Sequence, residues 1–418
     1  MFQSPRLLII LWWAYLLSLA TTISGMELCS SVIALVVMIS WAKNLKSIRQ
    51  IPIPTIWLPL LLFSAVLVVG VVLGDAALKD QWHDIRRIRF FLLFFVLYEF
   101  LRTRGDQLSW VKPLACITAV IGVYGFFQHF FPLDIVRSEE FKIIRYALQD
   151  EKVGPLVLGV FNHHLTFASI FAFYACLFMA FGVGLWPRHR WSLFLGILLG
   201  LDWFWTQSRT AWFAIPIAVL VIMSFKSRRW VMGGLAACAL LALSAYSLDP
   251  GFRGRLDRAM MDPETEQGIA PRARLWKVQL EIFKEHPWFG IGYNNNERQA
   301  EKYMRKLYPE IEKPFLGHAH STPLQILATM GIFGTIGYLW FWSLIFKSNA
   351  YLIRYAPDQS TKWLAVGLLA GFISFHIQSL TQWNFGDAEV LHNLIFFWAV
   401  LLTQTQRSFL RISGGSLL

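Results

Sequence analysis

Long apolar stretches recur along the whole chain and limit what it can fold into. A stretch of roughly 20 apolar residues can cross a bilayer as a helix. Of the 418 residues, 56% are hydrophobic and only 15% are charged, which is too few charges for a typical soluble domain. We therefore predict an all-α polytopic membrane protein with about twelve transmembrane helices. The predicted helices cover residues 7–24, 27–42, 54–74, 88–101, 111–131, 163–185, 191–207, 209–225, 230–247, 322–346, 363–383 and 389–406.

The positions of Lys and Arg predict the orientation of these helices. Short cytoplasmic loops carry an excess of basic residues, and every second connection of this chain is basic, as in the Lys226–Arg229 turn. The alternation predicts that both termini lie in the cytoplasm. It divides the chain into residues 1–247 with nine helices, a large external loop at 248–321, and residues 322–418 with three helices and a short cytoplasmic tail.

Besides the arginines of the large loop (Arg253, Arg255, Arg258, Arg272 and Arg274), four arginines in shorter connections stand on the external side, against this bias. Arg86, Arg87 and Arg89 lie at the start of the fourth helix, and Arg209 lies in the turn between helices seven and eight. They could contact lipid headgroups, because long basic side chains extend toward the interface. They could equally bind an anionic ligand such as a phosphate or diphosphate, which the guanidinium fork fits well.

The external loop contains a predicted helix and a tight turn. Pro271 suits the first turn of a helix. Arg272 follows at once, where its guanidinium and the free backbone N–H groups would suit an anion; Arg274 is a second candidate or a solvated side chain. Gly290 and Gly292 predict a tight turn that would let the backbone approach a ligand.

The loop closes on two histidines. His318 and His320 precede Thr322-Pro-Leu-Gln325, which has the pattern of a capping box with Pro at the first helical position. We therefore place His320 just before the tenth membrane helix. The positive end of that helix disfavours an imidazolium, so the ring stays neutral and able to accept a proton near pH 7. An interfacial His that only bonds to backbone is the alternative, and the spacing of ligands does not suit zinc.

Two further polar positions lie on the same side. Asp387, between the last two helices, could orient a histidine, pair with an arginine, or be an ordinary loop carboxylate. Asn162-His163-His164 opens the sixth helix and is interpreted as structural capping.

Taken together, these motifs resemble the O-antigen ligase and polymerase family. The resemblance rests on Arg209 in the turn between helices seven and eight, R-x-x-x-W at Arg272–Trp276, P-x-x-G-x-G at Pro287–Gly292, and H-x-H-[SN] at His318–Ser321. The order of the helices, with one large loop before the tenth, extends the resemblance over most of the chain. Ser321 departs from the Asn that is frequent after the second His.

The resemblance implies a GT-C-like glycosyltransferase of the bacterial inner membrane with its active site on the periplasmic face. Its donor would be a glycan linked to undecaprenyl diphosphate, and its acceptor the lipid A–core of lipopolysaccharide. No cofactor and no nucleic acid would be involved, and the sequence indicates no oligomeric state. By the motifs, Arg209 and Arg272 would hold the diphosphate and His320 would be the catalytic residue. The roles of Arg86, Arg87 and Arg89 rest on the charge argument instead.

The chemistry of the residues agrees with this reaction. A diphosphate is a good leaving group, so preorganised Arg donors need only stabilise its developing charge. A neutral His320 could take the proton of the acceptor hydroxyl. No Asp-x-Asp pair stands on the external side. We therefore predict a metal-independent reaction that inverts the anomeric centre.

Three alternatives remain at this point. An O-antigen polymerase would join two lipid-linked glycans, although polymerases tend to have two large external loops. A protein O-oligosaccharyltransferase would normally carry an additional soluble region. A lipid-diphosphate transporter, from a different class, would need charges at mid-membrane and inverted repeats, and Asp202 is the main candidate for such a charge.

Overall fold

The structure is a computed structural model. It describes residues 5–43, 55–73, 82, 84–104, 108–131, 134–138, 156–261 and 270–413. All regular secondary structure in these ranges is helical. The predicted all-α class is therefore confirmed.

The long helices of the described ranges fall on the predicted apolar segments, one helix to each segment. They are α1 (Pro5–Thr21), α2 (Ile23–Lys43), α4 (Trp57–Leu73), α6 (Arg89–Arg104), α7 (Val111–Phe130), α9 (His164–Gly184), α10 (Arg190–Trp205), α11 (Arg209–Ser224), α12 (Arg228–Leu248), α17 (Thr322–Tyr355), α18 (Gln359–Ser379) and α19 (Ala388–Ile412). Between them lie the shorter elements η1 (Arg86–Ile88), α13 (Pro250–Met261), α14 (Ala270–Glu285), α15 (Asn295–Arg298), α16 (Ala300–Leu307) and η2 (Asn384–Gly386).

Six of the described helices are both long and apolar enough to cross a membrane: α2, α7, α9, α12, α17 and α18. Three further apolar helices are shorter, covering Arg6–Thr21, Trp57–Leu73 and Arg209–Ser224. A membrane protein with several spanning helices is thus supported.

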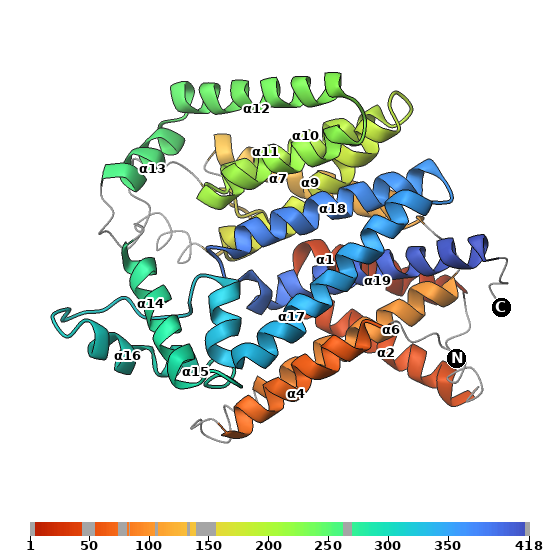
Figure 1. Ribbon diagram of the computed structural model, residues 1–418. Coiled ribbons are helices and arrows are strands. Elements are labelled where there is room, and N and C mark those ends of the chain that lie inside the picture. Colours follow the sequence, from red (N-terminus) through yellow and green to blue (C-terminus); the bar gives the residue numbers. More distant parts are fainter. Residues whose placement is uncertain are drawn as a thin grey trace.

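The helices α9, α10 and α18 pack closely within the bundle (Figure 1). Small residues allow this. A Cβ on Gly182 of α9 would lie 2.3 Å from the backbone N of Leu193, and one on Gly196 of α10 would lie 2.5 Å from the backbone N of Met179. Side chains at these positions would force the two helices apart. The helix α12 differs, since it lies at the periphery with few buried residues.

One end of the bundle collects the starts of α9, α11, α17 and α19 and the ends of α10 and α18; we call it the site end. Side-chain hydrogen bonds tie these termini together. Thr322 Oγ1 donates to the backbone O of Gln382 (2.9 Å), and Gln382 Nε2 donates to Ser208 Oγ (3.0 Å). Thr166 of α9 donates to Asp387 at the start of α19. The helices α14, α15 and α16 lie at this end as well (Figure 1).

The tenth predicted membrane helix is broken. Gly331, inside α17, has φ 61° and ψ −161°, so the expectation of a continuous helix over 322–346 is wrong at this residue. The first amides after the break find partners in the preceding loop. The N–H of Ile332 donates to the O of Pro287 (2.8 Å), and that of Phe333 donates to the O of Trp288 (3.3 Å).

The carbonyl groups before the break are satisfied by the same loop. The N–H of Ile291 donates to the O of Ala328 (3.0 Å), and that of Gly292 donates to the O of Thr329 (3.1 Å). A Cβ on Gly290 would lie only 2.2 Å from the carbonyl carbon of Thr329, so this close approach requires glycine. The segment 287–292 therefore clamps both sides of the break.

The external-loop segment has a small hydrophobic core of its own. Leu275, Val278 and Ile282 form the buried face of α14, as the apolar spacing of a helix dictates. They pack with buried residues of the neighbouring elements, namely Ile291, Tyr303, Met304 and Ala328. Because Ala328 belongs to α17, the first part of that helix packs as part of the loop.

Candidate active site

Arg272 and Arg209 lie close together at the site end. As predicted, α14 begins next to Pro271, and Arg272 stands in its first turn. Burial lowers the pKa of Arg272, and the positive charge of Arg209 lowers it further. Within the described part of the chain, Arg272 forms no hydrogen bond or ion pair. Arg272 and Arg209 are both positively charged, and no carboxylate pairs with Arg272 in the described chain. This arrangement favours the binding of an anion.

His318 and His320 lie beside these arginines. Their ring centroids are 4.1 Å apart, and the N–H of His320 donates to His318 Nδ1 (3.1 Å). His320 has a left-handed φ of 46°, a conformation uncommon for a residue with a side chain. The ring of Phe315 stacks on that of His320, with centroids 5.9 Å apart.

Both histidines are neutral at pH 7. Burial, together with smaller effects of the neighbouring His318, Arg272 and His163, lowers the pKa of His320 to about 3. Burial likewise lowers the pKa of His318 to about 4, with contributions from His163 and Arg272. His320 is therefore neutral, as the sequence predicted from its position at a helix terminus. The main cause, however, is burial, with a further contribution from the neighbouring cationic Arg272.

His163 is a member of this cluster that sequence reasoning did not include. Its Nδ1 accepts a hydrogen bond from the N–H of Leu165 (3.2 Å), so the predicted capping role is confirmed. Its electrostatic effect on His318 and His320 also places it next to them. The one available signal was its position at a helix start on the same side of the bundle.

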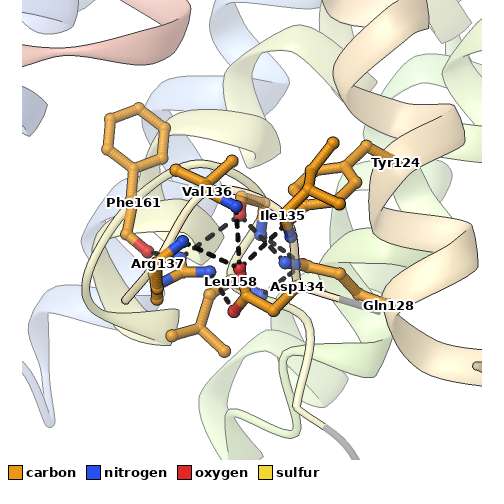
Figure 2. A network of polar contacts seen from close by, with 9 residues as sticks. Tyr124, Gln128, Asp134, Ile135, Val136, Arg137, Leu158 and Phe161 are labelled. Carbon is orange, nitrogen blue, oxygen red and sulfur yellow. Dashed lines mark hydrogen bonds and ion pairs between the residues drawn. The ribbon is translucent and has the colours of Figure 1, made fainter. Parts of the chain in front are cut away.

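A buried polar network holds the segment that leads to His163 (Figure 2). Arg137 forms an ion pair with Asp134 (2.6 Å), and its guanidinium donates to the backbone oxygens of Gly159 and Phe161. The Gln128 side chain accepts from the N–H of Gly159 (2.8 Å) and donates to its O (3.1 Å). Each of these polar groups is nearly excluded from solvent, so the network fixes the chain two residues before His163.

Three buried amide side chains connect the helix of Arg272 to the histidines. Asn296 Nδ2 donates to Gln279 Oε1 on α14 and to Gln325 Oε1 on α17, both at 2.8 Å. Gln325 Oε1 also accepts from the N–H of Ala319, which lies between the two histidines (2.8 Å).

The predicted capping box is therefore wrong. Ser321 is the N-cap without a side-chain bond, and Gln325 serves this network instead.

The position of Arg209 is set by its neighbours in sequence. Ser208 Oγ and Thr210 Oγ1 both accept from Gln382 Nε2, at 3.0 and 3.2 Å. Gln382 in turn is bonded to Thr322, two residues after His320. The helices α11 and α17 both begin here without a side-chain cap. Their first N–H groups add positive potential to that of the arginines.

The arginines at the start of the fourth helix have other surroundings. Arg87 donates to the O of Gly386 (3.0 Å), and its guanidinium lies over the Tyr293 ring at 5.9 Å. Arg89 forms an ion pair with Glu27 and is more than half exposed. Arg86 lies in the η1 turn. Within the described part of the chain, these contacts of Arg87 and Arg89 do not reach Arg272 or His320.

The remaining predicted residues lie near the site in different ways. Arg274 is a half-buried residue of α14, two positions after Arg272. Asp387 caps α19 by accepting from the N–H of Glu389 (3.0 Å), and its charge acts on His163. Gly290 and Gly292, with φ of 70° and 96°, form the clamp on α17. No group of three potential metal ligands occurs among the described residues.

The fold and this cluster define a class: an all-helical membrane protein with a cluster of arginines and histidines at one end of its helices. Comparisons with known proteins show which family this chain resembles. Residues 194–339 match the family model described as O-Antigen ligase, and this segment includes Arg209, Arg272 and His320. The resemblance to the O-antigen ligase family is thereby confirmed.

A curated protein from Pseudomonas aeruginosa, named O-antigen ligase, is also similar to this chain. It is 26% identical over 203 residues, which is 44% of this chain and 46% of that protein. The chain thus spans about half the length of the curated relative it matches.

Proposed function

We propose that the protein is a glycosyltransferase that moves O-antigen glycan from undecaprenyl diphosphate to the lipid A–core of lipopolysaccharide. The observation that carries the proposal is the pairing of Arg272 and Arg209 beside the neutral His320. The family match over residues 194–339 supports the same reaction. The site end then faces the periplasm of a Gram-negative inner membrane, with about twelve spanning helices and the segment 248–321 outside.

The two arginines bind the diphosphate of the donor. Arg272 has no partner in the described chain, so its donors are available to phosphate oxygens. The uncapped start of α11, next to Arg209, supplies further N–H groups. As the bond between sugar and phosphate breaks, negative charge grows on the departing diphosphate. Preorganised donors stabilise this charge without a metal ion.

His320 accepts the proton of the acceptor hydroxyl. The ring is neutral before the donor binds, because burial and the neighbouring positive charge of Arg272 lower its pKa. A bound diphosphate counteracts the charge of Arg272. The pKa of His320 therefore rises when the donor is present, which makes the ring a better base when it is needed.

The acceptor oxygen attacks the anomeric carbon directly. The bond to the acceptor forms as the bond to phosphate breaks, and the proton passes to His320. The configuration at the anomeric carbon is inverted in this single displacement. A retained configuration in the product would contradict the mechanism, and comparison of the anomeric proton couplings of donor and product by NMR measures it.

A reconstituted transfer assay tests the function. Purified protein is mixed with a lipid-diphosphate-linked glycan and rough lipopolysaccharide in the presence of a chelator. We expect glycan to appear on the lipopolysaccharide and the reaction to survive chelation. Growth of the lipid-linked glycan without transfer to lipopolysaccharide would instead identify a polymerase.

A further inference from the structure

A cavity lies at the far end of α14 from Arg272. Its volume is about 500 Å³. Its lining is in part polar, with Glu285, Lys302 and Tyr303, and in part apolar, with Leu73 and Trp288. Glu285 lies thirteen residues after Arg272 on the same helix, which places the cavity roughly 20 Å from the arginine at 1.5 Å per residue. The cavity is therefore separate from the candidate active site.

The apolar part of the lining belongs to the membrane boundary. Leu73 is the last residue of α4. Trp288 stacks on Phe333, two residues after the break in α17, with ring centroids 5.9 Å apart. Trp288 remains 62% exposed, so much of its ring is available to another molecule. Exposed Trp at the end of apolar helices is typical of the interface between lipid and water.

The polar part of the lining offers donors that the protein does not use. Lys302 lies over the Tyr303 ring at 5.5 Å and forms no hydrogen bond or ion pair within the described chain. The carboxylate of Glu285, by contrast, is engaged by Lys306 and by the Tyr303 hydroxyl, each at 2.7 Å. A ligand here would meet a free ammonium group and an exposed aromatic ring. That combination suits hydroxyl-rich and anionic headgroups rather than bare lipid chains.

We propose that this cavity binds the saccharide headgroup of the acceptor glycolipid, and this proposal rests on the proposed function. The acceptor is anchored in the bilayer by its lipid, while its terminal sugar must reach His320. The cavity lies at the membrane boundary, and α14 leads from it to Arg272. Binding in the cavity would fix one end of the acceptor, so that its other end reaches the donor. Trp288 supports a sugar ring, and Lys302 binds a phosphate or carboxylate of the headgroup.

Steady-state transfer tests the assignment. Rough lipopolysaccharide is varied at a saturating concentration of donor. We expect Trp288→Ala and Lys302→Glu each to raise the acceptor KM about tenfold and to leave kcat and the donor KM unchanged. The matched controls are Trp13→Ala, an exposed Trp of α1, and Lys277→Glu, an exposed Lys of α14 outside the cavity. An unchanged acceptor KM in both cavity variants, or a raised donor KM, would overturn the proposal.

Cross-linking separates failure of this proposal from failure of the function. A photo-reactive phenylalanine derivative replaces Lys302 in the His320→Ala protein, and the probes are rough lipopolysaccharide, lipid A without core, and the lipid-diphosphate-linked glycan. We expect an adduct with rough lipopolysaccharide alone. That adduct in a protein whose wild type transfers nothing would support the cavity and reject the function. Active transfer by the wild type with no such adduct would reject the cavity alone.

Discussion

Two groups of arginines lie on the same side of the bundle, and they differ in the partners that their side chains have. Arg87 and Arg89 are bonded to Gly386 and Glu27, whereas Arg272 has no hydrogen bond or ion pair in the described chain and lies beside Arg209. Sequence analysis predicted both groups as candidates for binding an anion. Charge placed against the topological bias therefore indicates a special position, and the partners of the side chain decide whether that position is available to a ligand.

The histidines of the site define the first and largest test of this comparison. Replacing His320 by Ala should lower kcat for transfer about a thousandfold, because it removes the group that accepts the acceptor proton. His376→Ala is the matched control, since His376 is largely buried between helices and the proposed mechanism does not use it. Equal rates for wild type and His320→Ala would remove His320 from the mechanism.

The two arginine groups are compared directly by Arg272→Ala and Arg89→Ala. We expect Arg272→Ala to lower kcat/KM for the donor about a hundredfold, because a preorganised donor to the diphosphate is lost. Arg89→Ala should change it less than about twofold, because an exposed ion pair contributes little. Arg272→Lys should recover only part of the rate, since lysine lacks the guanidinium fork. Similar losses in the two alanine variants would show that the two arginine groups do not differ in their role.

The buried amides that join α14 to the histidines offer a sharper test. Gln325→Leu removes the acceptor for the N–H of Ala319 and leaves Asn296 without one of its partners. We expect kcat to fall about tenfold, because His320 is less well positioned, with less effect on the KM for the donor. The thermal midpoint of each variant is measured in parallel. A loss of rate that follows only the loss of folded protein would reject the positioning role.

The smallest expected effect is on the dependence of rate on pH. A base must be deprotonated, so the rate is lost as the pH falls through its pKa. In the free enzyme the pKa of His320 is about 3, so kcat/KM should be flat down to about pH 5. The profile of kcat should fall at a higher pH, because the bound diphosphate raises that pKa. Superimposable profiles would argue that Arg272 and His320 do not interact through the ligand.

Much of this fold follows directly from the sequence. Each predicted apolar segment is a helix, since an apolar run of this length has few other ways to satisfy its backbone. The start of α14 at Pro271 and the turn at Arg209 were predicted for the same local reasons. What could not be predicted depends on contacts between distant segments. The break at Gly331 requires the backbone of residues 287–292 as a partner, and a capping pattern at Thr322 gave no sign of it.

The site shows the same division. The sequence singled out Arg209, Arg272 and His320, and the structure brings them together. Sequence analysis could not assign His163 to the cluster. That assignment requires the start of α9 to lie against the end of the loop, which only the structure shows. Nor could sequence analysis distinguish Arg87 from Arg272, because Gly386 lies 299 residues away from Arg87 in the chain.

The clamped break in α17 also links the site to the bilayer itself. An unbroken helix of 34 residues would be about 51 Å long, far more than the roughly 30 Å hydrocarbon core. The part beyond Gly331, residues 332–355, is about 36 Å long and fits by tilting. Because the segment 287–292 bonds to both sides of the break, the two parts of α17 form a rigid elbow. We therefore expect a change of tilt with membrane thickness to be transmitted through this clamp toward the turn that holds His320.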